Sequence, residues 1–176
     1  PIPELFKPKV FAEMTEYVAD WKTVDKITVY PYPCKSASST AAKIIRHYKD
    51  NGHFVLDGSR SEEAYFFVNS VREIKEILKQ AKLTNDECRI ICADDEMNHY
   101  KLEGFEISSS TAPAKRFTFV TCKAFEGVDY YSETAICFIV SDGYNKHTLI
   151  SIDMDIPQIA GRIRTKSNPF RNKIVH

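Results

Sequence analysis

Several polar residues directly follow short apolar runs in the sequence, in positions where they could bind phosphate groups. Asn69 and Ser70 follow the apolar run at residues 65–68 and precede a segment with helical periodicity. The first N–H groups of a helix have no intrahelical partner, so they form a favourable site for an anion such as a nucleic-acid phosphate. Ser70 and Glu73 also fit a capping box, so we expect Ser70 to cap this helix whether or not it contacts a phosphate.

A second set of polar residues follows the apolar run at residues 117–120. Thr121 can offer its hydroxyl and its backbone N–H to an adjacent phosphate. Lys123 could add a positive charge there, although a solvated surface lysine explains it equally well. Gly127 would let the chain turn tightly before Val128, because glycine tolerates backbone angles that other residues avoid.

A third set lies on a predicted helix at residues 157–163. With about 100° between successive residues, one face of this helix is apolar. Gln158, Arg162 and the position of Thr165 lie on another face, within about 60° of one another. Arg164 would point about 120° away from Gln158 if the helix continued that far.

These residues are positioned by an alternation of strands and helices. Short apolar strands bounded by helices are typical of a parallel sheet covered on both faces, and ligands of such sheets gather at the carboxyl ends of the strands. The sequence predicts strands near residues 27–30, 65–68, 89–93, 117–120, 135–140, 148–152 and 173–175, and helices near 10–19, 39–49, 71–81, 94–102 and 157–163.

Three segments of the chain resemble, in order, spacing and local structure, motifs IV, V and VI of superfamily 2 helicases of the DEAD/DEAH type. They are residues 65–71 (YFFVNSV), 118–129 (TFVTCKAFEGVD) and 158–164 (QIAGRIR). The middle match is the most specific, because it fits the pattern T-x5-G-x-D from Thr121 onward. These motifs belong to the second of two RecA-like domains. The resemblance extends more loosely to helicases of phage and mobile-element replication or mobilisation systems.

The resemblance implies an α/β fold of the RecA-like three-layer type, with a mostly parallel central sheet and helices on both faces. It also implies that the chain is the C-terminal motor domain of an ATP-dependent helicase or translocase. In such domains an arginine of motif VI stabilises transition-state charge on the ATP phosphates. The family's roles would fall on Arg162, Gln158 and Arg164 at the ATP phosphates, Gly127 and Asp129 at the nucleotide, and Asn69, Ser70, Thr121 and Lys123 at the nucleic acid.

The chain departs from the family pattern at one position. Many relatives carry Q-x-x-G-R-x-x-R, whose final arginine reaches the γ-phosphate, but here that position is Thr165 and Arg164 comes one residue early. Either the helix unwinds before this point or Arg162 is the only arginine finger. Asp129, which the resemblance places near the nucleotide sugar and the domain interface, has an alternative as an ordinary turn aspartate.

The chain lacks the residues that bind ATP in the first domain of such enzymes. A P-loop needs glycines followed by a lysine, and no Gly-Lys pair occurs in the sequence. ATP and magnesium would therefore be held mainly by an absent first RecA-like domain, N-terminal in the parent chain, and this chain alone is not expected to be catalytic. The other expected partner is single-stranded nucleic acid, DNA rather than RNA, and no membrane.

No metal site of the chain's own is expected. Asp94, Asp95 and Glu96 imitate an acidic magnesium-binding motif, but they lie between the first two helicase-like segments and fit an acidic cap at the start of a helix. Asp153 and Asp155 have no companion ligands nearby, so they fit loop positions. The five histidines show no metal-ligand spacing.

Length and composition exclude other classes. The chain has 176 residues; we expect residues 1–50 to form an N-terminal extension or linker containing a strand and a helix, and residues 51–176 to form the RecA-like domain. Hydrophobic content of 43% excludes a disordered chain, and no apolar run is long enough for a transmembrane helix. Five cysteines without a C-x-x-C pattern fit a reducing, cytoplasmic setting.

The charge distribution is uneven. The 24 basic and 24 acidic side chains balance, which argues against a generally cationic nucleic-acid-binding surface. Residues 158–176 nevertheless contain five basic residues and no acid, whereas acids outnumber bases by eleven to six in residues 61–106. A solvated basic surface explains this tail without any partner.

Two alternatives to a helicase domain remain open. The chain could be a RecA-like relic that acts as a protein-interaction or scaffold domain without binding nucleotide, which the change at Thr165 favours. It could also be an unrelated nucleotide- or sugar-binding enzyme of the parallel-sheet class, with accidental motif matches. The helicase interpretation requires Ser70, Thr121 and Gln158 to line one edge of a single sheet, so a scattered arrangement would contradict it.

Overall fold

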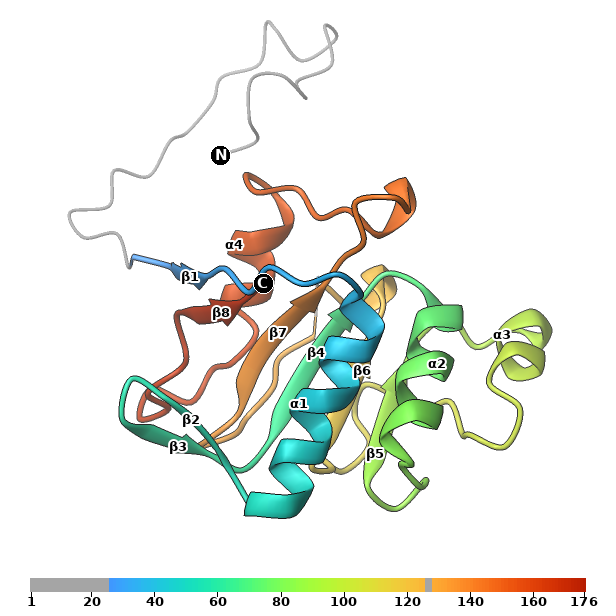
Figure 1. Cartoon of the computed structure of the whole chain (residues 1–176), viewed down its shortest axis with the longest axis horizontal. Helices are drawn as coiled ribbons and strands as arrows, with labels where there is room; N and C mark the ends of the chain where they lie inside the picture. The colour runs from blue at the N-terminus through green and yellow to red at the C-terminus, as the bar shows by residue number, and fades with distance from the viewer. Residues whose placement is uncertain (1–25, 126–127) are drawn as a thin grey trace, which may run out of the picture.

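The structure, a computed structural model, describes residues 26–125 and 128–176. Its centre is a six-stranded sheet in which all strands are parallel, in the order β1-β8-β7-β4-β6-β5 (Figure 1). The expected α/β class with a parallel central sheet is therefore confirmed. The strands of this sheet are β1 (Thr28–Tyr30), β4 (Ala64–Val68), β5 (Cys88–Ile91), β6 (Phe117–Val120), β7 (Ile136–Val140) and β8 (Lys173–Val175).

Helices pack on both faces of the sheet. Phe66 and Val68 of β4 join the core that α1 and α2 cover, and these two helices lie in front of the sheet in Figure 1. Tyr65 and Phe67 point to the opposite face, where they join the core that contains the apolar residues of α4. The three layers are consistent with a RecA-like sandwich. The helices are α1 (Ala37–Asn51), α2 (Val71–Ala81), α3 (Glu96–Lys101) and α4 (Asp155–Ala160), with short 3-10 turns η3 (Cys122–Ala124) and η4 (Lys146–Thr148).

Capping serines fix where the two long helices begin. Ser36 Oγ accepts a hydrogen bond from Ser39 N, and Ser70 Oγ accepts one from Glu73 N, each at 3.3 Å. The predicted cap at Ser70 is thus confirmed. The Glu73 carboxylate does not return to Ser70 to complete a capping box, because it accepts a hydrogen bond from Asn145 Nδ2 at 3.1 Å and ties α2 to the loop after β7.

An antiparallel hairpin precedes β4, and the sequence expectations above do not include it. Its strands are β2 (Phe54–Leu56) and β3 (Ser59–Ser61). Asp57 and Gly58 form its two-residue turn with φ of 50° and 75°, the geometry favoured in tight hairpins. Asp57 also fixes the hairpin to the sheet, because its carboxylate accepts a hydrogen bond from the Tyr30 hydroxyl and pairs with Lys173 Nζ at 2.9 Å.

The strand expected at residues 148–152 is not formed. Thr148 is buried, and its Oγ1 donates to Asn145 O at 2.8 Å while accepting from Asp142 N at 2.9 Å. These local hydrogen bonds close the 3-10 turn η4, so the segment begins in a turn instead of a strand.

The last helix is shorter than the sequence predicts. It starts two residues earlier than expected and ends at Ala160, because Ile163 forms a parallel bridge with Tyr130. The other predicted strands, and the helices at residues 39–49, 71–81 and 94–102, are confirmed with shifts of a few residues at their ends. The helix predicted near residues 10–19 lies outside the described residues.

The first described elements belong to the same layered unit as the rest. β1 pairs with β8, with Thr28 opposite Lys173, and α1 contributes to the core that α2 covers. The strand and helix predicted within residues 1–50 therefore extend the sheet and its core. In the described part of the chain, none of the helices combines the length and the apolar character that crossing a membrane requires.

Replacing Asp57 by Asn should lower the melting temperature at neutral pH. The hydrogen bond from the Tyr30 hydroxyl, followed by that from Lys173, lowers the pKa of the Asp57 carboxyl below its ordinary value of 3.8. The folded state therefore favours the ionised carboxylate, so this stabilisation is present above about pH 4 and is lost as the pH falls through the lowered pKa. Thermal unfolding should show wild type and Asp57→Asn converging at strongly acidic pH.

Asp86 provides the matched control, because it is an exposed aspartate in the turn before β5. Asp86→Asn should leave the melting temperature unchanged across the pH range. A loss for Asp57→Asn that persists below the lowered pKa, where the carboxyl is protonated in both states, would contradict the ionic tether.

Candidate functional site

The candidate site begins at the carboxyl ends of two adjacent strands. β4 ends at Val68 and β6 at Val120, and the two strands pair in parallel with Phe67 opposite Val120. Ser70 and Thr121 therefore follow the same edge of one sheet, which lies at the top of Figure 1. In open parallel sheets this is the edge at which ligands bind.

Helix α2 presents its first N–H groups at this edge. The first intrahelical hydrogen bond runs from Ile74 N to Ser70 O at 3.0 Å, and the N–H of Glu73 is capped by the Ser70 hydroxyl. The N–H groups of Val71 and Arg72 precede both of these bonds. Within the described part of the chain neither has a hydrogen-bond partner, so both can bind an anion, which the positive end of the helix dipole would also attract.

Asn69 joins three segments of the edge. Its Nδ2 donates to His147 O at 2.8 Å, and its Oδ1 accepts from Cys122 N at 3.4 Å. His147 lies in η4 after β7, and Cys122 begins η3 after β6, so the amide bridges the connections that follow both neighbours of β4. A contact between the Asn69 side chain and a nucleic acid would have to replace these hydrogen bonds.

Thr121 is only partly free to bind a ligand. Its N–H donates to Ile91 O at 3.0 Å, continuing the β5–β6 ladder, so the backbone contact with a phosphate that the sequence analysis expects is not available. Its hydroxyl is the group that remains, although only 7% of the residue is exposed. Lys123, in η3, is exposed and lines a pocket of about 350 Å³ together with Asp94.

The segment that follows η3 and the segment that follows α4 are joined into one unit. Tyr130 N donates to Arg162 O at 2.8 Å, and Arg164 N donates to Tyr130 O at 2.9 Å, forming a parallel bridge between Tyr130 and Ile163. The Asp129 carboxylate then lies 2.7 Å from Arg164 Nε and 4.0 Å from an Arg162 terminal nitrogen. Two of the three sets of candidate residues therefore meet in space.

Arg162 is held inside the fold, with 8% of the residue exposed. Its Nε donates to Gln158 O at 2.8 Å and a terminal nitrogen donates to Val128 O at 3.1 Å. The second terminal nitrogen lies 3.5 Å from Gln158 Oε1, so these two side chains do lie side by side. Gln158 therefore contacts Arg162, which also bonds Val128, and among the described residues no hydrogen bond joins Gln158 to Ser70 or Thr121.

Arg164 is the more accessible of the two arginines. Because α4 ends at Ala160, the chain leaves the helix before Arg164 and brings its side chain to Asp129. This is the first alternative that the sequence leaves open at Thr165, an unwound helix. The Arg164 side chain is 44% exposed against 10% for Arg162, so it can reach an external ligand without breaking buried hydrogen bonds. Gly127 lies outside the described residues.

No protein-family model matches the chain, and no curated protein matches it. The function therefore has to be inferred from the arginine–aspartate unit and from the start of α2.

The acidic run at residues 94–96 caps α3, as the sequence analysis predicts. Asp95 accepts a hydrogen bond from Asn98 N at 2.8 Å. Asp155 likewise acts locally, accepting one from Ser151 N at 2.8 Å. Among the described residues, no group of three or more His, Cys, Asp or Glu side chains is arranged to hold a metal ion.

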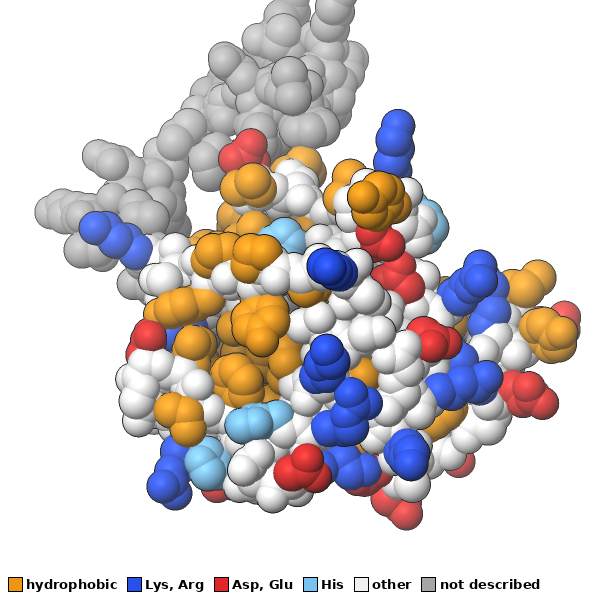
Figure 2. Space-filling model, viewed as in Figure 1, with side chains coloured by type: hydrophobic (Ala, Val, Ile, Leu, Met, Phe, Trp, Pro, Cys, Tyr) orange, Lys and Arg blue, Asp and Glu red, His pale blue; other side chains and the backbone are white. Residues whose placement is uncertain are grey.

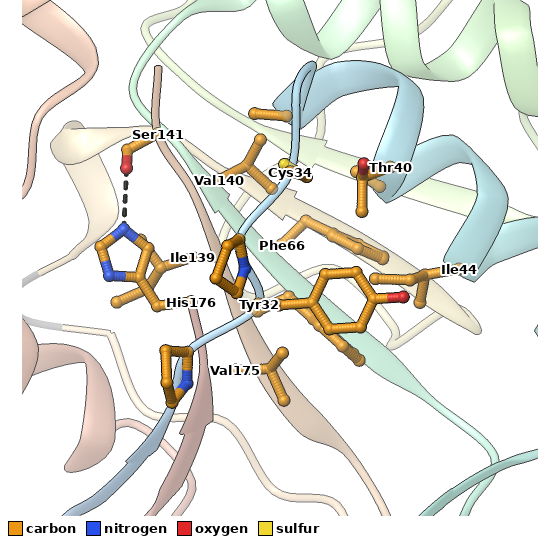
Figure 3. A pocket seen from close by; sticks show the side chains of 15 residues that line it. Tyr32, Cys34, Thr40, Ile44, Phe66, Ile139, Val140, Ser141, Val175 and His176 are labelled. Atoms are coloured by element: carbon orange, nitrogen blue, oxygen red, sulfur yellow. Dashed lines mark hydrogen bonds between the residues drawn. The ribbon is translucent and has the colours of Figure 1, made fainter. Parts of the chain in front are cut away.

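A pocket of about 260 Å³ lies beside the other half of the sheet, between the β1–α1 connection and the ends of β7 and β8 (Figure 3). Tyr32, Ile44 and Phe66 line it, and Figure 2 shows apolar side chains gathered here with Lys and Arg over α1 and α2. At its rim Ser141 Oγ lies 2.7 Å from His176 Nε2, and burial lowers the pKa of His176.

The sequence analysis missed this pocket. Its available indication was the Pro-Tyr-Pro sequence between β1 and α1, an apolar connection that lines the pocket. Within the described residues, no carboxylate bonds the second ring nitrogen of His176, so the Ser141–His176 pair lacks the third group of a hydrolase triad.

The two arginines should differ sharply in their contribution to stability. Arg162→Met would leave the carbonyl oxygens of Gln158 and Val128 without their donor and should lower the free energy of unfolding by about 2–3 kcal/mol. Arg164→Met removes a half-exposed ion pair and should cost less than about 1 kcal/mol. Urea unfolding measures both; equal costs would contradict the anchoring role of Arg162.

Proposed function

We propose that this chain is the C-terminal RecA-like motor domain of an ATP-dependent nucleic-acid helicase or translocase. The observation that carries the proposal is the contact of Asp129 with Arg162 and Arg164. Asp129 lies on the connection that begins with Thr121, and the two arginines follow α4. An arginine fork beside an acidic anchor suits the recognition of nucleotide phosphates. The start of α2, which Ser70 caps at the neighbouring strand end, suits a nucleic-acid backbone.

In the proposed enzyme, the edge formed by β4 and β6 holds one strand of nucleic acid. The free N–H groups at the start of α2 and the Thr121 hydroxyl would contact neighbouring phosphates, and Lys123 would add charge beside them. Asn69 would act mainly by keeping the connections after β4, β6 and β7 in place. Phosphate contacts carry no sequence information, so the binding should be nonspecific and dependent on salt.

ATP and magnesium would be held mainly by a P-loop domain N-terminal to this chain. When that domain closes on the nucleotide, Arg164 would exchange the Asp129 carboxylate for phosphate oxygens and stabilise transition-state charge. Arg162 and Gln158 would hold the segment after α4 against the segment around Val128, because Arg162 bonds both Gln158 and Val128 inside the fold. The assignment of the finger to Arg164 rests on its exposure.

A RecA-like relic that serves as a protein-interaction or scaffold domain is the second candidate. It is favoured by the internal use of the family's phosphate-binding groups: Arg162 bonds Gln158 and Val128, and Asp129 pairs with Arg164. Such a domain would need these contacts only for folding. Its parent protein would then show no turnover that depends on either arginine.

A reducing, cytoplasmic setting is part of the proposal. The described residues contain five free cysteines, of which Cys34 and Cys122 are exposed. Exposed thiols are stable as thiols where the surroundings are reducing, and they oxidise or pair elsewhere. Cys122 lies next to Thr121 at the proposed nucleic-acid edge, so its oxidation would disturb that contact.

In a chain that includes the upstream domain, Arg164→Ala should lower the kcat of nucleic-acid-stimulated ATP hydrolysis by about 10³-fold, the effect typical of an arginine finger. Lys166→Ala is the matched control, because it removes an exposed cation two residues away and should leave kcat unchanged. Steady-state ATPase assays with and without single-stranded DNA measure both. Turnover indifferent to Arg164 and Arg162 alike, in folded variants, would contradict the proposal.

The chain by itself should hydrolyse no ATP and should bind single-stranded DNA weakly. Thr121→Val removes the hydroxyl without changing the shape of the side chain, and it should weaken binding about threefold, the value of one modest hydrogen bond. Fluorescence anisotropy with a labelled oligonucleotide should show the logarithm of affinity falling linearly with that of the salt concentration. Magnesium-dependent ATP hydrolysis by the pure chain would contradict the expectation that a chain without a P-loop is inactive alone.

A further inference from the structure

A row of polar side chains crosses the sheet on the face that packs against α4. Arg89 of β5 lies opposite Thr118 of β6, and Thr118 lies opposite Tyr65 of β4. All three are buried, with 4% of Arg89 exposed and none of the other two. Tyr130 covers this row, with its ring centre 5.0 Å from that of Tyr65 and 5.7 Å from the Arg89 guanidinium carbon.

The polar atoms of this row have almost no partners. Within residues 26–125 and 128–176, Arg89 donates one hydrogen bond, from a terminal nitrogen to Ala112 O, and its Nε has no acceptor. Among the described residues, the hydroxyls of Thr118 and Tyr130 have no hydrogen-bond partner, and the Tyr65 hydroxyl has at most a weak hydrogen bond with Ser132, which acts to lower its pKa. Among the described residues, no carboxylate forms an ion pair with Arg89.

Three of these residues line a pocket. Arg89, Tyr65 and Tyr130 contribute to a cavity of about 420 Å³, whose rim includes Thr111 and Asp129. The Asp129 carboxylate is paired with Arg164 at 2.7 Å, and the Glu63 carboxylate lies close enough to Tyr65 to help raise its pKa, but among the described residues neither forms an ion pair with Arg89. The Arg89 side chain, with its Nε buried and without an acceptor among the described residues, therefore lies in the wall of a space that is large enough for a small ligand.

This arrangement is costly unless something occupies the pocket. Burying an unpaired charge or an unbonded hydroxyl costs free energy, and a buried cation without a counter-ion costs the most. An anion in the pocket would supply the missing acceptors and the missing charge together. Burial raises the pKa of Tyr130 to about 12 and also raises the pKa of Tyr65, so both phenols keep their protons near neutral pH and can donate.

We propose that this pocket binds an oxyanion, the phosphate or carboxylate group of a small ligand, through the Arg89 guanidinium and the hydroxyls of Tyr65 and Tyr130. The site is separate from the edge discussed above. Tyr65 is the second residue of β4 and Arg89 the second of β5, whereas Ser70 follows the carboxyl end of β4. The inference does not depend on the proposed helicase function, because it uses none of the arginines of the Asp129 unit.

Isothermal titration of the chain with inorganic phosphate, citrate and adenosine monophosphate, at constant ionic strength, tests the proposal. Arg89→Met should raise the dissociation constant at least about tenfold, the value of a charge-assisted hydrogen bond. Without ligand, the same variant should melt at the same or a higher temperature, because replacing an unpaired buried charge by an apolar group is neutral or stabilising. Tyr130→Phe and Tyr65→Phe should each weaken binding about threefold.

Two controls separate this pocket from other cationic surfaces. Arg60→Met removes an exposed arginine of β3 and should leave binding unchanged. Ser70→Ala alters the start of α2 and should also leave it unchanged. Tighter binding of adenosine monophosphate than of phosphate or citrate would identify the anion as part of a nucleotide, whereas preference for citrate would identify a carboxylate ligand.

The proposal would be overturned by wild-type protein that binds none of the three probes at millimolar concentration. It would equally be overturned by binding that Ser70→Ala weakens and Arg89→Met leaves intact, since the anion would then lie at α2. Should Arg89→Met fail to fold, the double variant Tyr65→Phe, Tyr130→Phe decides the question: it keeps the guanidinium and the ring packing, so unchanged binding would contradict the pocket.

Discussion

The rest of the structure depends on β4, because all five residues of this strand are buried. A strand covered on both faces must place alternate side chains in two separate cores, and here one core lies under α1 and α2 and the other under α4. Its parallel neighbours β6 and β7 then end at the same edge. The candidate residues after these strands are brought together by apolar burial in the centre of the sheet, and no attraction among them is needed.

Two arginines two residues apart have different surroundings. Both follow the end of α4 at Ala160, and they flank Ile163, which forms the bridge to Tyr130. Arg162 faces inward and bonds backbone oxygens, whereas Arg164 faces Asp129 at the surface. A fixed arginine beside a movable one is a useful arrangement for a site that must close on a charged ligand. The fixed residue sets the position of the segment, and the movable residue changes partner at little cost, because exposed ion pairs contribute little free energy.

Local features of the fold could be read from the sequence, and features that depend on distant segments could not. The apolar runs of β4 and β7 and the cap at Ser70 are local, and each was predicted correctly. Asp57-Gly58 was an equally local indication of a hairpin that the sequence analysis did not use. The segment at Thr148 has strand-like composition, but its hydroxyl bonds the chain three residues back and closes a turn.

The roles of the site residues stay predictions, because long-range packing decides which of their groups are free. The burial of Arg162 depends on Val128 O, which is 34 residues away in the chain. The Thr121 N–H is used by Ile91 of a neighbouring strand. The row from Arg89 to Tyr65 depends on the register of three strands. Composition and periodicity carry no information about such pairings, so the sequence could name the residue types of the site and not their partners.

The position of β8 between β1 and β7 has a consequence for how the molecule is made. β1 is an edge strand whose neighbour in the sheet is β8. Thr28, near the start of the described chain, therefore cannot form its strand pairing until Lys173 has been synthesised. During synthesis on the ribosome, β1 would leave its backbone N–H and C=O groups to water or to a chaperone until the final strand emerges. Proteolysis or premature termination before residue 173 would likewise deprive the sheet of two strands, since the loss of one isolates the other.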